Sequence, residues 1–350
     1  MTPTKAYAAQ TQAAPLSEFD IERRSIGAAD VQIAIDYCGV CHSDLHMVNN
    51  DWGMSAYPVV PGHEIIGHVT SVGADVSRFQ VGDHVGVGCF VDSCRTCEAC
   101  KAHEEQYCLN GFTMTYGSAT QDPGGVTFGG YSQAIVCDQN YVLRLPDSLE
   151  LAGAAPLLCA GITTYSPLRH WRVQAGQTVG VIGLGGLGHM GVKFASAMGA
   201  RTVMITRSSA KGQDAKALGA DDVLLSTDDE AMQNWTGKFD FLLNTIPVVH
   251  DLNPYLNLLK FNSTMCIVGA IGEFKSLQVP QMIFGRRAVA GSLIGGIQET
   301  QEMLDFCGEK NITSNIEVIA MQDINNAYKR MQKSDVKYRF VIDMNTLPKA

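Results

Sequence analysis

Cysteine and histidine residues gather in three places of this 350-residue chain where their spacing suits metal chemistry. The densest is Cys94-x2-Cys97-x2-Cys100-x7-Cys108. Four thiolates this close in sequence can complete a tetrahedral shell around Zn²⁺, which predicts a structural zinc site that holds a loop without its own core. The same C-x2-C-x2-C run also begins some iron–sulfur motifs, although here the fourth spacing differs and no Cys-Pro follows. Free thiols or disulfides are the remaining alternative.

The other two places mix histidine, cysteine and carboxylate side chains. Cys41 to His46 reads Cys-His-Ser-Asp-Leu-His, and His63-Glu64 follows Pro61-Gly62. Cys159 stands apart from both, in an apolar stretch. Spacing alone does not show that these two places and Cys159 meet in the fold, because a single buried cysteine is usually a small core residue.

A glycine-rich loop predicts a dinucleotide site. Its G-x-G-x-x-G motif consists of Gly183, Leu184, Gly185, Gly186, Leu187 and Gly188. The motif follows a strand predicted at 178–183 and begins a helix predicted at 187–198, which is the context that the motif requires. Gly185 would let the backbone approach a pyrophosphate, Gly188 would let the helix pack on the sheet, and the helix N-terminus would attract the phosphates.

The end of the next predicted strand indicates which dinucleotide binds. NAD-binding proteins usually carry an acidic residue there for the ribose 2′-hydroxyl. This sequence instead reads Thr206, Arg207, Ser208, Ser209, Ala210 and Lys211. Arg207 and Lys211 could pair with a 2′-phosphate, with hydrogen bonds from the two serines. The pattern favours NADP(H), and polar residues at the start of a helix are the alternative.

The elements that must position these residues fall into two groups. Up to about residue 150, short β-like runs separated by Gly and Pro turns predict a mostly antiparallel β domain, with strands at 31–37, 65–72, 84–88 and 133–136. From about residue 175, strands at 178–183, 202–206, 239–244 and 264–269 alternate with helices, which predicts a doubly wound parallel sheet. Glycines at 291–296 indicate a boundary, followed by helices near 300–306 and 324–331 and a strand at 338–343.

Composition narrows the class of protein. The formal net charge is −9 and no basic stripe is present, so a nucleic-acid partner is not expected. Residues 151–168 carry no charge, but their prolines, glycines and hydroxyl side chains favour a buried helix with a ligand-facing cysteine over a membrane span. The N-terminus does not resemble a signal peptide, and eleven cysteines in such a chain suit metal binding in the reducing cytoplasm.

The motifs together resemble a known family. GVCHSDLH, PGHEIIG, the four-cysteine lobe, LLCAGITTYSPLRH and GLGGLGHMG occur in the order found in zinc-dependent medium-chain alcohol dehydrogenases. NDWGMSAYPVVPGHE, DVKYRFVID and the missing strand-end acid resemble the cinnamyl alcohol dehydrogenase branch, whose bacterial and yeast members are NADPH-dependent aldehyde reductases. The resemblance covers nearly the whole chain. It implies a GroES-like catalytic domain of residues 1–158 and 294–350, with a Rossmann NADP-binding domain of residues 159–293 inserted.

The resemblance also implies roles for single residues. Cys41, His63 and Cys159 would hold a catalytic zinc, giving two zinc ions per chain with the structural one. Zinc would polarise an aldehyde carbonyl and NADPH would deliver the hydride. Asp44 would orient His63, Glu64 would approach the metal transiently, and Ser43 and His46 would relay the proton. Further cofactor contacts would come from His42, Thr163, Val268 and Arg339.

Positions that line the substrate cleft in plant members are mostly large and apolar here, which favours aromatic or medium-length aldehydes. They are Met47, Trp52, Met54, Cys89, Met114, Leu293 and Ile294. Met114 replaces a tryptophan of the plant enzymes, which argues against strict specificity for lignin-type substrates. Two alternatives stay open: a polyol dehydrogenase of the same fold, and a non-catalytic relative that only binds a dinucleotide. The family further implies a homodimer, formed near residues 289–294.

Overall fold

The computed structural model describes residues 1–269, 272–273 and 276–348. The chain divides into two compact units, Met1–Cys159 with Gly295–Ala350, and Ala160–Ile294. Both boundaries lie one residue later than the sequence suggested. The difference has a chemical consequence, because Cys159 belongs to the same unit as Cys41 and His63.

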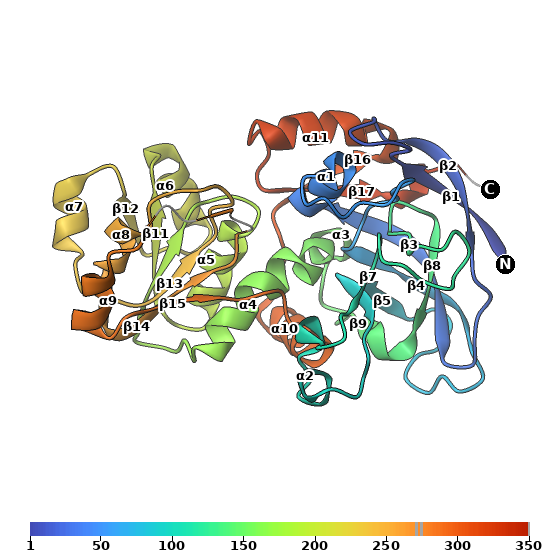
Figure 1. Ribbon diagram of the computed structural model, residues 1–350, viewed down its shortest axis with the longest axis horizontal. Helices are drawn as coiled ribbons and strands as arrows, with labels where there is room; N and C mark the ends of the chain where they lie inside the picture. The colour runs from blue at the N-terminus through green and yellow to red at the C-terminus, as the bar shows by residue number, and fades with distance from the viewer. Residues whose placement is uncertain (270–271, 274–275, 349–350) are drawn as a thin grey trace. The chain divides into compact units, whose positions relative to one another are not determined.

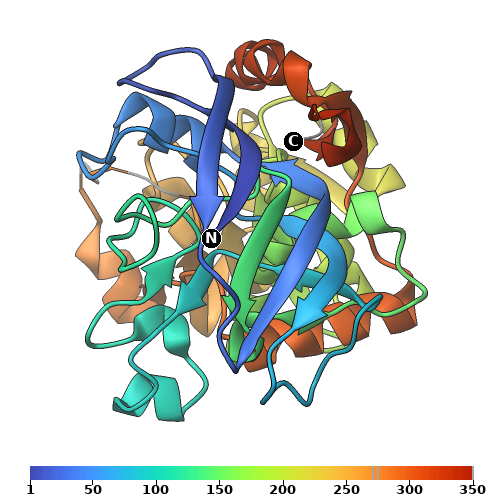
Figure 2. The same cartoon turned by 90° about the vertical axis from the view of Figure 1, so that its right-hand side faces the viewer.

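The first unit is built on a β-sheet of mixed direction, and β3 lies near its middle. Along this sheet the strands follow the order β16-β17-β3-β4-β5-β9, and β8 also pairs with β3. Figure 2 shows β3 between β4 and β8, both antiparallel to it. These strands are β3 (Asp30–Val40), β4 (Ile65–Val72), β5 (His84–Val87), β8 (Ala134–Asp138), β9 (Leu143–Arg144), β16 (Ile316–Ala320) and β17 (Arg339–Asp343). Two smaller pairs are β1 (Thr2–Ala8) with β2 (Ser17–Arg23) and β6 (Phe90–Asp92) with β7 (Thr113–Met114).

Short helices connect these strands (Figure 1). The α-helices are α1 (His42–Asn49), α2 (Glu98–Lys101), α3 (Leu151–Ala154), α10 (Ile297–Lys310) and α11 (Ile324–Gln332). Five 3₁₀ turns accompany them: η1 (Glu105–Tyr107), η2 (Gln139–Tyr141), η3 (Ala155–Leu158), η4 (Met321–Asp323) and η5 (Met344–Thr346). Helix α1 begins just after β3 ends, so this central strand places the Cys41–His46 motif at its C-terminal end.

The second unit is a six-stranded parallel sheet with the strand order β12-β11-β10-β13-β14-β15. Counted within the unit this is 3-2-1-4-5-6, the order of a dinucleotide-binding fold with its switch point between β10 and β13. The strands are β10 (Thr178–Ile182), β11 (Arg201–Thr206), β12 (Asp222–Leu225), β13 (Phe239–Asn244), β14 (Leu259–Ile267) and β15 (Ala288–Gly291). The helices are α4 (Ala160–His170), α5 (Gly188–Ala197), α6 (Ser209–Ala217), α7 (Asp229–Asn234), α8 (Asn253–Leu256) and α9 (Val279–Gly285).

The uncharged stretch 151–168 differs from the single helix that the sequence suggested. It forms α3, η3 and α4, with a bend of 57° between the segments on either side of Cys159. Cys159 leaves the helical region, with φ −131° and ψ −67°. No single described helix is long and apolar enough to span a membrane, and this bent pair meets that test by length and composition only.

Candidate functional site

The three sequence segments with mixed cysteine and histidine residues meet in the first unit. The ligand atoms of Cys41, His63, Glu64 and Cys159 all lie within 4.8 Å of one another. Cys41 precedes α1, His63 and Glu64 precede β4, and Cys159 stands at the break between η3 and α4. The helix break therefore serves the site, because a straight helix would carry Cys159 in a different direction.

Hydrogen bonds link the donors of this group, and the one between the two thiols raises the pKa of Cys159 well above its ordinary value while it lowers that of Cys41. The thiol of Cys41 has a pKa well below its ordinary value, first because Cys159 donates a hydrogen bond to it and also because His63 does so. A thiolate beside an imidazole is a common zinc-binding arrangement. The Nδ1 atom of His63 lies 3.0 Å from Oδ1 of Asp44, which leaves Nε2 for the metal.

Glu64 is fully buried and has two differently bound oxygens. Oε1 accepts a hydrogen bond from Nη2 of Arg339, whereas Oε2 has no partner. Burial raises the pKa of Glu64 to about 7 and the Cys41 charge adds to this, against the attraction of Arg339. A bound cation would explain a buried carboxylate oxygen that has no hydrogen-bond partner and lies beside two thiols and an imidazole. The donor set therefore fits a zinc ion.

The proton-relay residues predicted from the sequence lie on α1. The Sγ atom of Cys41 lies 3.7 Å from Oγ of Ser43. The Nδ1 atom of His46 lies 2.7 Å from Oδ2 of Asp51, and its ring lies 5.2 Å from that of Trp52. Sequence reasoning missed Asp51, although a carboxylate five residues after a relay histidine could have indicated it. Because Asp51 binds Nδ1, Nε2 of His46 is the nitrogen that can exchange a proton.

The four-cysteine lobe also forms a compact donor set. The four sulfur atoms of Cys94, Cys97, Cys100 and Cys108 lie within 4.8 Å of one another. Backbone N–H groups of Thr96 and Cys97 lower the pKa of Cys94 to about 5. All eleven cysteines of the chain are free thiols. Four thiol donors would fill the tetrahedral coordination shell of a zinc ion, so this cluster is a candidate for a structural zinc site.

The glycine loop lies at the C-terminal end of β10, where a dinucleotide is expected. Gly183 has φ +91°, a conformation that favours glycine, and a Cβ on Gly188 would lie only 1.9 Å from the Gly183 carbonyl oxygen. A Cβ on Gly185 would meet no atom within 4 Å, so this side of the loop is open. Gly186 and Leu187 complete the turn into α5. This loop fits a pyrophosphate at a helix N-terminus.

Residues at the end of β11 differ in their exposure and in the contacts that their side chains make. Thr206 is buried at the end of the strand, while Arg207 and Ser209 are exposed. Ser208 caps α6 by accepting a hydrogen bond from the Lys211 backbone N–H. The Lys211 Nζ donates to the Leu184 carbonyl oxygen at 3.3 Å. Within the described parts of the chain, Arg207 has no ion pair or hydrogen bond.

The other predicted cofactor residues are spread over both units. His42 is exposed at the start of α1, and Arg339 is buried at the start of β17. Arg339 binds Glu64 and the Val40 carbonyl oxygen, contacts that sequence reasoning did not anticipate. Thr163 in α4 and Val268 after β14 belong to the second unit.

The predicted substrate residues also differ in exposure. Trp52 and Met54 are exposed, Cys89 and Met114 half-buried. Met47 is only 2% exposed and packs with Val59 and Tyr116, so it belongs to the core beneath α1 instead of an open wall. Leu293 and Ile294 end the second unit.

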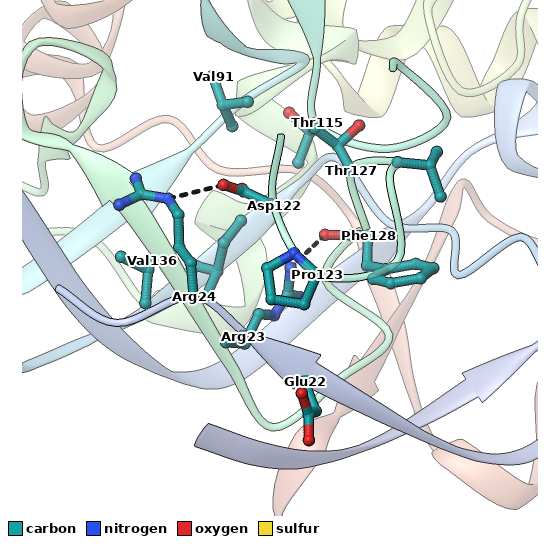
Figure 3. Close-up of a pocket in the computed structure, with 12 residues that line it drawn as sticks. Glu22, Arg23, Arg24, Val91, Thr115, Asp122, Pro123, Thr127, Phe128 and Val136 are labelled. Carbon is teal, nitrogen blue, oxygen red and sulfur yellow. Dashed lines mark hydrogen bonds and ion pairs between the residues drawn. The ribbon is translucent and has the colours of Figure 1, made fainter. Parts of the chain in front are cut away.

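A small cavity of about 40 Å³ lies elsewhere in the first unit, between β2, β8 and the loop at 122–128 (Figure 3). It contains none of the predicted site residues. Arg24 pairs with Asp122 across it, and Nη1 of Arg23 donates to the Phe128 carbonyl oxygen at 2.7 Å. These charged groups are therefore already paired within the protein.

Comparisons with known proteins agree with this geometry. Residues 27–147 match the alcohol dehydrogenase GroES-like domain, and residues 186–309 match the zinc-binding dehydrogenase model. The chain is 55% identical to aldehyde reductase YahK of Escherichia coli K12, over 98% of this chain and 99% of that protein.

Two solved structures are also similar over their full length. A cinnamyl alcohol dehydrogenase of Sorghum bicolor is 44% identical with a TM-score of 0.95, covering 100% of this chain and 99% of its own. That of Helicobacter pylori, solved with NADP(H), is 42% identical with a TM-score of 0.90, covering 99% of both chains. The two units thus have the GroES-like and Rossmann folds that the motifs implied. This chain belongs to the zinc-dependent medium-chain alcohol dehydrogenases, in their cinnamyl alcohol dehydrogenase branch.

Proposed function

We propose that this enzyme reduces aldehydes reversibly to primary alcohols with NADPH and a zinc ion held by Cys41, His63 and Cys159. The observation that carries the proposal is the buried donor set, four ligand atoms within 4.8 Å of one another. It occurs in a chain 55% identical to an aldehyde reductase. A three-residue Cys₂His set leaves a fourth position for substrate, as a catalytic zinc requires. The intact set argues against a non-catalytic, dinucleotide-binding role.

Zinc and NADPH would supply the Lewis acid and the hydride for the reduction, and side chains of the protein would supply the proton. When bound, zinc supplies Lewis acidity at the carbonyl oxygen and NADPH supplies the hydride. Ser43 donates the proton to the product oxygen, and His46 replaces that proton. Asp51 holds His46 in the tautomer that this transfer needs. Glu64 would offer the bound zinc a further oxygen donor beside Cys41, His63 and Cys159.

Cofactor selectivity follows from the end of β11. Arg207 is exposed and has no partner within the described residues, so its guanidinium is available to a 2′-phosphate. Ser209 adds a hydroxyl, Ser208 caps α6, and Lys211 adds a positive charge. Thr206 is the last residue of β11 and is buried. We also retain His42, Thr163, Val268 and Arg339 as proposed cofactor contacts.

Substrate preference rests on the exposed apolar groups. Trp52, Met54, Cys89 and Met114 lie partly open in the first unit, and Leu293 is 46% exposed in the second. Such side chains favour aromatic and medium-chain aldehydes over polyols. Met47 is buried in the first unit and Ile294 in the second, and we retain both as proposed substrate residues.

We further propose a cytoplasmic homodimer. Strand β15 is at the edge of the described parallel sheet, and an unpaired edge can join a second copy. On nearby α9, Ile283 is 69% and Phe284 89% exposed, which is unusual for side chains of this size. Six thiols in two metal sites also suit a reducing compartment.

Metal analysis tests the proposed site. The purified protein should contain two zinc ions per chain, and Cys159→Ser should contain one while keeping its fold by circular dichroism. The matched control is Cys307→Ser, because Cys307 is buried in α10 outside both donor sets. One zinc in the unmodified protein, or two in Cys159→Ser, would contradict the assignment.

A further inference from the structure

Asp44 is a fully buried carboxylate beside His63 of the proposed zinc site. It accepts hydrogen bonds from the backbone N–H groups of Cys41 at 2.9 Å and Gly62 at 3.1 Å. Its Oδ1 also meets Nδ1 of His63. In the described part of the chain, no lysine or arginine lies within ion-pair distance of it. A buried charge is costly unless several donors surround it, so every donor here contributes to holding the carboxylate in place.

Two tyrosine hydroxyls complete this arrangement. Tyr116 donates to Oδ1 of Asp44 at 2.7 Å, and Tyr131 donates to Oδ2 at 3.3 Å. Tyr116 is 5% exposed and Tyr131 is fully buried. Each oxygen of the carboxylate thus has one tyrosine, and together they limit rotation of the Asp44 side chain. Because Oδ1 is shared with His63, any such rotation would also turn the imidazole.

Both tyrosines contact the segment that carries the zinc ligand His63. The ring of Tyr116 lies 5.8 Å from that of His63. The Tyr131 backbone N–H donates to the Pro61 carbonyl oxygen at 2.9 Å. Gly62 has φ +102°, and a Cβ there would lie 2.8 Å from Cδ1 of Tyr131. The turn that presents His63 is therefore shaped against the Tyr131 ring.

We propose that Tyr116 and Tyr131 are positioning residues for the zinc ligand His63 and act on it through Asp44. Their hydroxyls hold the carboxylate so that it accepts the Nδ1 proton, which keeps Nε2 directed at the metal. Neither tyrosine touches the reacting atoms. This inference rests on the proposed zinc site of Cys41, His63 and Cys159, and it concerns how tightly that site holds its metal.

The test compares release of the two zinc ions from the holoenzyme to a colorimetric chelator. In Tyr116→Phe we expect one zinc to dissociate about tenfold faster, the usual scale for loss of an outer-shell partner. Tyr131→Phe should act in the same direction but less, because its hydrogen bond is longer. The zinc of the Cys94 cluster serves as an internal control and should leave at an unchanged rate. Substitution with Co²⁺ should shift the visible absorption of the Cys41 site in both variants.

Tyr255→Phe is the matched control. Tyr255 is buried in the core of the second unit and belongs to neither donor set. Loss of its hydroxyl should leave both release rates and the Co²⁺ spectrum unchanged. Unaltered release and spectra in Tyr116→Phe and Tyr131→Phe would overturn the inference, as would an equal effect of Tyr255→Phe. An unmodified protein with only the Cys94-cluster zinc would overturn the proposed zinc site and this inference with it, and the two failures are thus told apart.

Discussion

Replacement of Arg207 tests the basis of cofactor selectivity. The side chain follows β11, is exposed and has no partner in the described residues, so its removal breaks no contact within the protein. A charge-assisted hydrogen bond contributes about 1.5–3 kcal/mol. At about 1.4 kcal/mol per decade, Arg207→Ala should lower kcat/KM for NADPH by roughly 10- to 150-fold. Solvent screening of this exposed group favours the lower end of that range.

The same variant should leave kcat/KM for NADH nearly unchanged, because NADH lacks the 2′-phosphate. Arg207→Asp should lower NADPH use further through repulsion, and it could improve NADH use by accepting from the ribose hydroxyl. Initial rates with both cofactors at fixed aldehyde measure the ratio. Lys216→Ala is the control, since Lys216 is exposed in the last turn of α6. An unchanged NADPH/NADH ratio in Arg207→Ala, or an equal change in the control, would refute the reasoning.

Other outcomes follow from the two metal sites, the relay and the glycine loop. His46→Ala should slow turnover and alter its pH profile with zinc content intact; an unaltered profile would count against the relay. Cys94→Ser should lose one zinc per chain and lower the thermal midpoint, as differential scanning calorimetry can show. In zinc-stripped protein, Cys94 should be alkylated at pH 6, above its pKa of about 5, whereas burial raises the pKa of Cys137 and should protect it. Peptide mass mapping decides this, and equal labelling would contradict it. Gly188→Ala should weaken NADPH binding in fluorescence titrations because its Cβ would clash with the Gly183 carbonyl; unchanged affinity would contradict that packing.

Elements bounded by clear signals were predictable. The strands at 65–72 and 239–244 have the bounds expected from their apolar runs and flanking turn residues. Strand β14 instead begins at Leu259, five residues before the expected start. The residues from Phe261 to Ser263 show no alternation of apolar and polar side chains that would predict a strand. The pairing of β13 with β14 is also irregular, with a register shift between Phe239 and Phe241.

Some residues of the site could also be predicted from the sequence, and others could not. Metal donors and glycines have types and spacings that indicate chemistry directly. The break at Cys159 has no such signal, because an uncharged apolar run has the same composition whether its helix is straight or bent. Tyr116 and Tyr131 reach Asp44 from 72 and 87 residues away, and no local pattern encodes contacts of that length. The Glu64–Arg339 pair spans 275 residues and escapes prediction for the same reason.

Oxidation of NADPH in the presence of aldehydes tests the central claim most directly. Consumption should be followed by ultraviolet absorbance with benzaldehyde, cinnamaldehyde, aliphatic aldehydes and ketones, and repeated with NADH and after metal chelation. We predict zinc-dependent turnover of aromatic and medium-chain aldehydes, faster with NADPH than with NADH, and recovery when zinc is restored. No turnover of any aldehyde by protein that contains two zinc ions, or equal rates with the two cofactors, would contradict the account.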